Sequence, residues 1–154
     1  MNHPPSTQPE KVYTMPGWYD GPRSGIADYL GKPHVFESLW ATGGGGCWAG
    51  LFLLMPIDEE TFALAMEDWT IWLRWISAFR AGEVTQDTSP TLPQDRQRHE
   101  AVVRLLGQRL EVVTERSITV RGDFRDGDHQ VLWTPVEESI DGMITFSALT
   151  SPGE

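Results

Sequence analysis

The sequence predicts an α+β fold in which a single-layer antiparallel sheet of about five to six strands packs with two helices. Residues 58–81 repeat apolar side chains with helical period and form one long Trp-rich helix, and residues 94–110 form a second, amphipathic helix. The segments on either side are rich in β-branched and aromatic residues and are separated by glycine-containing turns. The predicted order is β-β-β-α-α-β-β-β.

The length of 154 residues fits one domain, which we place at residues 12–150. The preceding segment, 1–11, is rich in proline and small polar residues and is expected to be a flexible N-terminal arm. Residues 151–154 are expected to be a frayed C-terminus.

Three strands are predicted before the helices. Ile26–Leu30 and His34–Ala41 form a hairpin, because Gly31 supplies the positive φ that a tight connection needs. The apolar run Cys47–Met55 is a third strand, buried on both faces and ended by Pro56.

The long helix carries two apolar stripes and a narrow polar strip. Acidic residues at 58–60 lie at its positive end, and Gly82 follows its last turn. The first stripe is Phe62, Ala65, Met66, Trp69, Leu73 and Ile76; the second is Leu64, Ile71, Trp75 and Ala78; the polar strip is Glu67, Thr70, Arg74 and Ser77.

Three strands are predicted after the helices. Residues 117–125 alternate apolar and polar side chains, as in a half-buried strand. Asp126-Gly127 is a strong hairpin signal that leads into a strand at 130–136. A last strand is expected at 143–148.

The chain carries 12 Lys and Arg against 22 Asp and Glu, a net charge of −10 that disfavours nucleic acid and anionic membranes as partners. Residues 91–125 are basic, with a net charge of +2, whereas residues 126–154 carry six acids and no base. The single cysteine, Cys47, excludes an internal disulfide, and no signal peptide is apparent. We therefore expect a cytoplasmic protein.

Motifs for cofactors and metals fail on their context. Gly43–Gly46 precedes a strand-like run instead of a helix, so a phosphate loop is not expected. The stretch from Asp126 resembles the start of a calcium loop but lacks the glycine at its sixth position. The four histidines have no ligand-like spacing. No cofactor and no metal site are predicted.

A loop at 17–25, continued to residue 29, combines aromatic, acidic and guanidinium groups with glycines, a composition typical of binding loops. The alternative is a structural loop held by an ion pair between Asp20 and Arg23. The ligand-binding candidates from this region are Tyr19, Asp20, Arg23, Asp28 and Tyr29.

Asp68 is the second candidate, with Trp72 and Trp75 beside it on the helix. A carboxylate among tryptophans must find a partner or become protonated, and such groups cluster at functional sites. A structural partner, an Arg or a Trp indole, is the alternative. His99, one turn after Asp95, could likewise form an Asp–His pair.

Residues 18–34, WYDGPRSGIADYLGKPH, together with 67–75, EDWTIWLRW, resemble a group of uncharacterised bacterial proteins. The similarity would cover about residues 12–136. It implies a bacterial cytosolic origin and one domain, and it implies no activity, substrate or catalytic residue.

Three functions stay open. The leading hypothesis is a non-catalytic interaction module that neutralises a basic partner, as immunity proteins and antitoxins do. Its expected contact residues are Asp126, Asp128, Glu137, Glu138 and Asp141. The alternatives are a ligand-binding protein or enzyme with an aromatic-walled pocket near Asp20, Arg23 and Tyr29, and an oligomer-forming scaffold that uses the second face of the Trp-rich helix.

Overall fold

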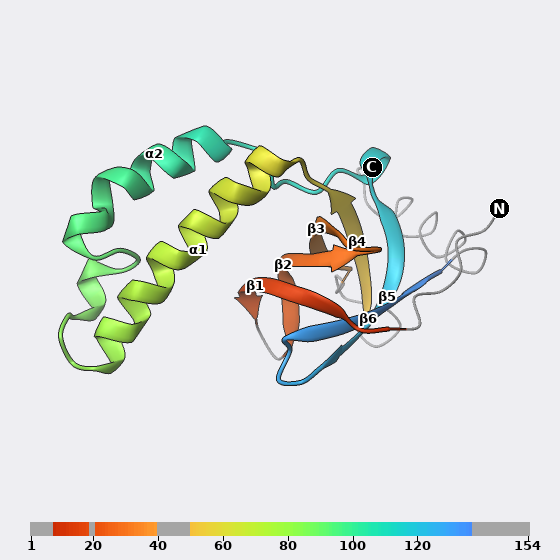
Figure 1. The fold of residues 1–154 in the computed structure, drawn as a ribbon, viewed down its shortest axis with the longest axis horizontal. Helices are drawn as coiled ribbons and strands as arrows, with labels where there is room; N and C mark the ends of the chain where they lie inside the picture. Colours follow the sequence, from red (N-terminus) through yellow and green to blue (C-terminus); the bar gives the residue numbers. More distant parts are fainter. Residues whose placement is uncertain (1–7, 19–20, 40–49, 137–154) are drawn as a thin grey trace, which may run out of the picture. The chain divides into compact units, whose positions relative to one another are not determined.

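The computed structural model describes residues 8–18, 21–39 and 50–136, and Figure 1 shows the order of their elements. The chain divides into two compact units: Met1–Pro56 with Val112–Glu154, and Ile57–Glu111. We call the first the barrel unit and the second the hairpin unit, and each is described by itself. The single domain at residues 12–150 stays a prediction.

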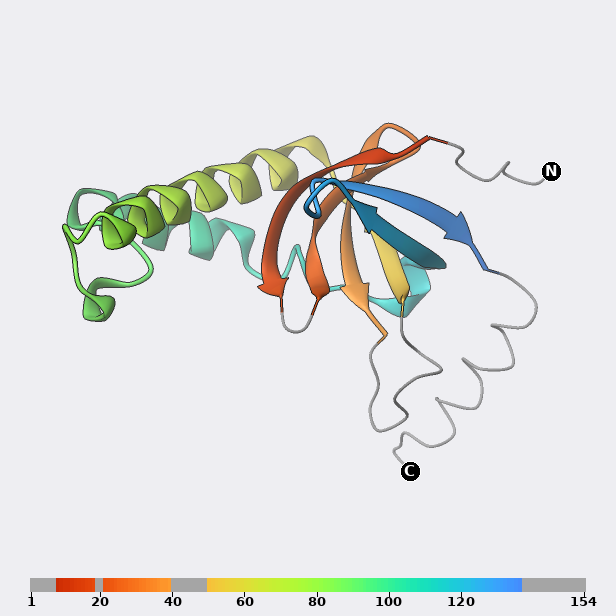
Figure 2. The same cartoon turned by 90° about the horizontal axis from the view of Figure 1, so that it is seen from below.

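All six described strands belong to the barrel unit, and each pairs antiparallel with the next until β6 returns to β1 (Figure 2). The ring closes where Glu10 pairs with Val131 and Lys11 with Gln130. The strands are β1 (Glu10–Trp18), β2 (Pro22–Tyr29), β3 (Lys32–Ser38), β4 (Leu51–Pro56), β5 (Ile118–Arg125) and β6 (Gln130–Pro135).

The α+β class with two helices is confirmed, but the single-layer sheet is wrong, because the sheet closes into a barrel. Closure pairs the first and last described strands, which an open layer would leave as edges. The order of the described elements is β-β-β-β-α-α-β-β, with an extra first strand, β1. The strand expected at 143–148 lies outside the described residues.

Strand β1 is irregular, and its irregularity sets the position of Tyr13. Val12 pairs with Ala27 and Thr14 with Ile26, so that Tyr13 is an extra residue in a bulge. The Thr14 hydroxyl accepts a hydrogen bond from the Ile26 N–H at 3.1 Å, which replaces a ladder bond there. The strand therefore bends without leaving this amide unpaired.

The interior of the barrel is filled by four aromatic side chains. The rings of Phe36, Phe52, Phe124 and Trp133 contact one another in all six combinations, with centroids 5.5 to 5.8 Å apart. Gly122 is paired with Trp133, and a Cβ atom at Gly122 would lie 2.6 Å from the Trp133 ring. The glycine therefore provides the space into which the indole packs.

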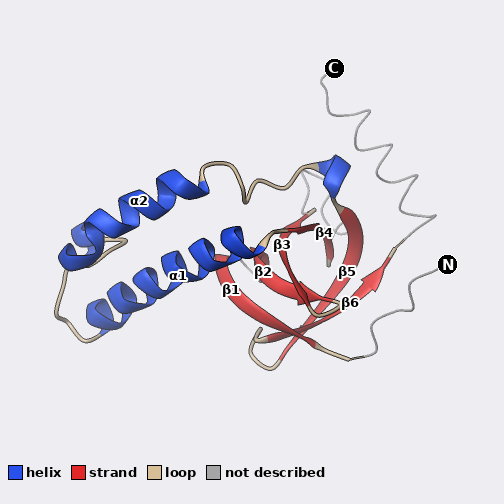
Figure 3. Ribbon diagram, turned by 45° about the horizontal axis from the view of Figure 1, so that its top comes forward, coloured by secondary structure: helices blue, strands red, loops and turns tan. Residues whose placement is uncertain are grey.

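The hairpin unit contains α1 (Glu59–Arg80) and α2 (Arg96–Leu106), which lie side by side in Figure 3. Helix α1 begins as the sequence predicts, because the Asp58 carboxylate accepts the Thr61 N–H at 2.8 Å. Three short 3₁₀ turns complete the described elements: η2 (Gln86–Thr88) and η3 (Pro93–Asp95) in this unit, and η4 (Thr114–Arg116) in the barrel unit.

The two helices share a small apolar core of Leu64, Val102 and Leu106, with Leu110 packed against it. The second predicted stripe of α1 is buried along its whole length, from Leu64 to Ala78. The first stripe is less buried, and Leu73 on it keeps 42% of its surface exposed.

Candidate functional site

An exposed tryptophan lies against an acidic turn of the barrel unit. Trp18, at the end of β1, is 58% exposed, and its indole N–H donates a hydrogen bond to Asp128 Oδ2 at 3.2 Å. These two residues are 110 positions apart in the sequence. We call Trp18, Asp126 and Asp128 the Trp18–Asp128 platform.

The acidic residues of the platform belong to the β5–β6 turn. Asp126, Gly127 and Asp128 have φ angles of 55°, 64° and 69°, the left-handed conformation that the Asp-Gly signal predicts for a tight hairpin. The side chain of Asp126 is exposed and has no hydrogen-bond or ion-pair partner among the described residues. Asp128 is half-buried, and only its Oδ2 atom is bonded within the same residues.

A second polar cluster in the barrel unit centres on Asp28. The Tyr13 hydroxyl, placed by the β1 bulge, donates to Asp28 Oδ2 at 3.1 Å, and the Trp133 indole N–H donates to the Asp28 carbonyl at 3.0 Å. Asp28 Oδ1 is buried and has no hydrogen-bond partner among the described residues. Burial, together with the Asp28 carboxylate, raises the pKa of Tyr13 above 10.0.

Tyr29 and His34 adjoin this cluster. Their rings meet edge to face, with centroids 5.4 Å apart. The Nδ1 atom of His34 lies 2.8 Å from the Lys32 carbonyl, which can only accept, so Nδ1 carries the proton and Nε2 is the acceptor. Burial lowers the pKa of His34 below 6.5, against the opposing effects of that hydrogen bond and of the Glu10 and Asp28 carboxylates. Burial raises the pKa of Tyr29, and Glu10 adds to the rise.

The predicted binding loop is only partly brought to this place. Asp28 and Tyr29 lie in the cluster, whereas Arg23 lies five residues earlier on β2, about 16 Å along an extended strand. Tyr19 and Asp20 lie outside the described residues, as do Glu137, Glu138 and Asp141. Asp68, Trp72 and Trp75 belong to the other unit.

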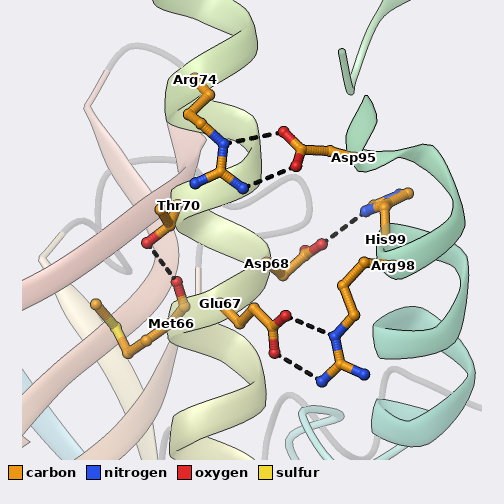
Figure 4. Close-up of polar contacts among 8 residues, drawn as sticks. All are labelled: Met66, Glu67, Asp68, Thr70, Arg74, Asp95, Arg98 and His99. Atoms are coloured by element: carbon orange, nitrogen blue, oxygen red, sulfur yellow. Dashed lines mark hydrogen bonds and ion pairs between the residues drawn. The ribbon is translucent and has the colours of Figure 1, made fainter. Parts of the chain in front are cut away.

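The hairpin unit holds a ladder of charged pairs between its helical segments, shown in Figure 4. Glu67 of α1 forms a two-bond ion pair with Arg98 of α2, at 2.6 and 2.8 Å. Seven residues further along α1, Arg74 forms a similar two-bond ion pair with Asp95, at 2.9 Å for both bonds. Glu67 and Arg74 both belong to the polar strip that the sequence predicts. Their side chains pair with other residues of the hairpin unit, so this strip is not in contact with solvent alone.

Between these two ion pairs, Asp68 forms a hydrogen bond with His99, and the Oδ1 and Nδ1 atoms are 2.8 Å apart. The expected partner of Asp68 was an arginine or an indole, and His99 was considered with Asp95; the structure corrects both pairings. The carboxylate accepts from Nδ1, so the neutral imidazole presents Nε2, which has no partner among the described residues. Such a pair could accept a proton from a ligand. The Thr70 hydroxyl drawn in Figure 4 donates to the Met66 carbonyl of its own helix at 2.9 Å.

The tryptophans expected beside Asp68 have packing contacts. Trp75 is 3% exposed, donates its indole N–H to the Thr88 hydroxyl at 2.8 Å, and stacks on Phe79. Trp72 stacks on Trp69, with ring centroids 5.1 Å apart. These contacts pack both tryptophans against other side chains of the hairpin unit. They account for the positions of Trp72 and Trp75 without a ligand.

Sequence reasoning did not select Trp18, Tyr13 or His34 as site residues. Trp18 was not chosen, although its flanking Gly17 and its position before a polar loop are signals of exposure. Tyr13 and His34 carry no local signal, because a bulge and a cross-strand contact bring them to Asp28.

No group of three or more His, Cys, Asp or Glu side chains among the described residues is arranged to hold a metal ion. None of the helices in the described part of the chain is long and apolar enough to cross a membrane. Comparison with protein-family models, with curated proteins and with solved structures finds no match to this chain.

Proposed function

We propose that the protein is a non-catalytic binding module that takes a cationic side chain of a basic partner on the Trp18–Asp128 platform. The observation that carries the proposal is that Trp18 is 58% exposed while its indole N–H is held by Asp128. A large aromatic side chain fixed in an exposed position is the kind of residue that dominates binding energy at protein interfaces.

The chemistry of the platform favours a cation. With the indole N–H already bonded, the aromatic faces are what Trp18 can offer, and these attract cations. The carboxylates of Asp126 and Asp128 in the adjoining turn add negatively charged hydrogen-bond acceptors, which also attract a cation. A chain charge of −10 would also speed the approach of a basic partner.

This proposal keeps the leading hypothesis from the sequence and gives it a location. Asp126 and Asp128 were expected contact residues, and Trp18 adds an aromatic surface that is hydrogen-bonded to Asp128. The role of Glu137, Glu138 and Asp141 in such a contact stays a prediction.

A titration of the full chain with a basic peptide tests the proposal. Calorimetry at low and moderate salt should show binding that Trp18→Ala weakens about threefold or more. Asp128→Asn should weaken it as well, whereas Glu100→Gln, an equal loss of charge at an exposed position of α2, should have a smaller effect. Equal losses for Asp128→Asn and Glu100→Gln, with none for Trp18→Ala, would mean attraction by net charge alone.

A small-ligand function is the second candidate, and one observation favours it. Asp28 Oδ1 is buried without a partner among the described residues, a costly arrangement that a donor group of a ligand would relieve. A thermal-shift screen of small amines and polyols tests it. A ligand that stabilises the wild type and leaves Asp28→Ala unchanged would support it, and a screen without such a ligand would count against it.

A further inference from the structure

We propose that the cation taken by the Trp18–Asp128 platform is an arginine guanidinium rather than a lysine ammonium, an inference that rests on the proposed function. Both groups are attracted by aromatic faces and carboxylates, so the choice between them depends on the shape and the exposure of the platform.

The first argument is the exposure of the indole. Trp18 keeps 58% of its surface in contact with solvent, so a docked cation would also remain partly in water. An ammonium is strongly hydrated, and it gains little on such a surface unless it gives up its water. A guanidinium is weakly hydrated, and its flat face can stack on a ring without that loss.

The second argument is the arrangement of acceptors at the rim. Oδ2 of Asp128 is used by the indole, while Oδ1 of Asp128 and both carboxylate oxygens of Asp126 have no partner among the described residues. A guanidinium has five N–H donors in one plane, so it can lie on a ring and donate from its edge at the same time. The three donors of an ammonium diverge from one point.

The third argument is the chemistry of the same hairpin. At the end of β5, just before Asp126, Arg125 donates through both Nε and Nη2 to Asp123 Oδ2, at 3.2 and 2.8 Å. Both side chains are more than half exposed. An exposed aspartate of β5 thus already engages a guanidinium in this structure, and the platform adds the aromatic face that Asp123 lacks.

The test compares two acetylated and amidated peptides, one of four Gly-Arg repeats and one of four Gly-Lys repeats, which carry the same charge. The full chain is labelled with ¹⁵N, and the indole N–H signal of Trp18 is identified by its absence in Trp18→Phe. We expect the arginine peptide to shift this signal and to bind about threefold to tenfold more tightly than the lysine peptide.

Two variants decide what causes the preference. Trp18→Ala should bring the ratio of the two affinities close to one, leaving weak binding through charge. Leu105→Ala, which removes a 48% exposed apolar side chain from α2, should leave the ratio unchanged. Dispersed amide spectra of each variant establish that it is folded.

The outcomes separate this inference from the proposed function. Equal affinities for the two peptides, both weakened by Trp18→Ala, would overturn the arginine preference and leave the proposed function standing. Affinities that Trp18→Ala does not change would overturn both. A preference for the arginine peptide that persists in Trp18→Ala would place the guanidinium elsewhere and overturn the inference.

Discussion

The barrel unit and the hairpin unit are held together by different forces. The barrel encloses four aromatic rings in mutual contact, and its ion pair between Arg125 and Asp123 lies exposed at a strand end. The hairpin also buries apolar side chains, among them Ile71, Trp75 and Val102, and in addition four charged pairs join its segments. The barrel therefore depends mainly on burial, and the hairpin depends on burial together with charge pairing.

This difference determines where polar groups are available for other work. In the hairpin, the carboxylates at 67, 68 and 95 already have cationic or imidazole partners. In the barrel, the interior is apolar and the acids of the β5–β6 turn keep unused acceptor atoms. A binding function is thus easier to assign to the β5–β6 turn of the barrel than to the paired carboxylates of the hairpin.

The largest expected effect is on the barrel core. Trp133→Ala removes a fully buried ring that contacts three others, and it should lower the free energy of unfolding by about 3–5 kcal/mol. Trp18→Ala is the matched control in the same unit, and it should change stability by about 0.5 kcal/mol or less because Trp18 is exposed. Denaturant unfolding measures both, and similar losses would contradict a barrel held by its core.

The partly buried hydrogen bond between Tyr13 and Asp28 in the barrel gives the next effect. Tyr13→Phe removes the hydroxyl that donates to Asp28 Oδ2 and should cost about 1–3 kcal/mol, since it leaves a half-buried carboxylate without this bond. Tyr29→Phe is the matched control, because the hydroxyl of Tyr29 has no hydrogen-bond partner among the described residues. Equal costs for the two changes would show that the Tyr13–Asp28 bond contributes nothing of its own.

Substitutions in the ion pairs between the helical segments of the hairpin should have smaller effects on stability. Arg74→Ala leaves Asp95, whose side chain is 12% exposed, without its partner and should be the more destabilising of two changes in these pairs. Arg98→Ala affects a pair with Glu67 whose side chains are 51% and 38% exposed, so the smaller loss of stability is expected. Hydrogen exchange in peptides from α1 and α2 measures both. A larger effect for Arg98→Ala would contradict the ranking by burial.

The sequence predicted those parts of the fold that depend on neighbouring residues. The long helix, the acidic residues at its start and the Asp126-Gly127 turn follow from local patterns, and all three are present. Barrel closure could not be predicted in this way, because it pairs Glu10 with Val131, near the two ends of the described chain. Strand β1 was missed because Pro16 and its bulges obscure the alternation of a strand.

The candidate site was less predictable than the fold for the same reason. The sequence selected Asp68 and His99 separately, but their pairing joins residues 31 positions apart across two helices. It also selected the acids of the β5–β6 turn without Trp18, whose indole bonds to Asp128 from 110 positions away in the sequence. Composition identifies the reactive groups of this chain, and only the tertiary pairing shows which of them are already neutralised.

The smallest expected effect is a difference in pH dependence between the units. Burial lowers the pKa of His34 below 6.5, so at intermediate pH the unfolded chain binds a proton that the folded barrel does not. The contribution of His34 is therefore complete above about pH 6.5 and is lost as the pH falls below it. In the hairpin, Arg74 lowers the pKa of Asp95 below 3.8 and Arg98 lowers that of Glu67 below 4.5. Their contributions persist until the pH falls below those values.

Hydrogen exchange between pH 7 and pH 5 separates these windows, measured in a His99→Gln background that removes the imidazole from the hairpin. Exchange, corrected for its intrinsic pH dependence, should become less protected in β2 and β3 while protection by the Asp95 and Glu67 pairs is kept. His34→Phe keeps a ring against Tyr29 and removes the titration, so it should abolish the change in the barrel, whereas His129→Gln, at an exposed histidine, should not. If the barrel still loosens in His34→Phe, another group must take up the proton, and the two units would not differ in the way their contacts imply.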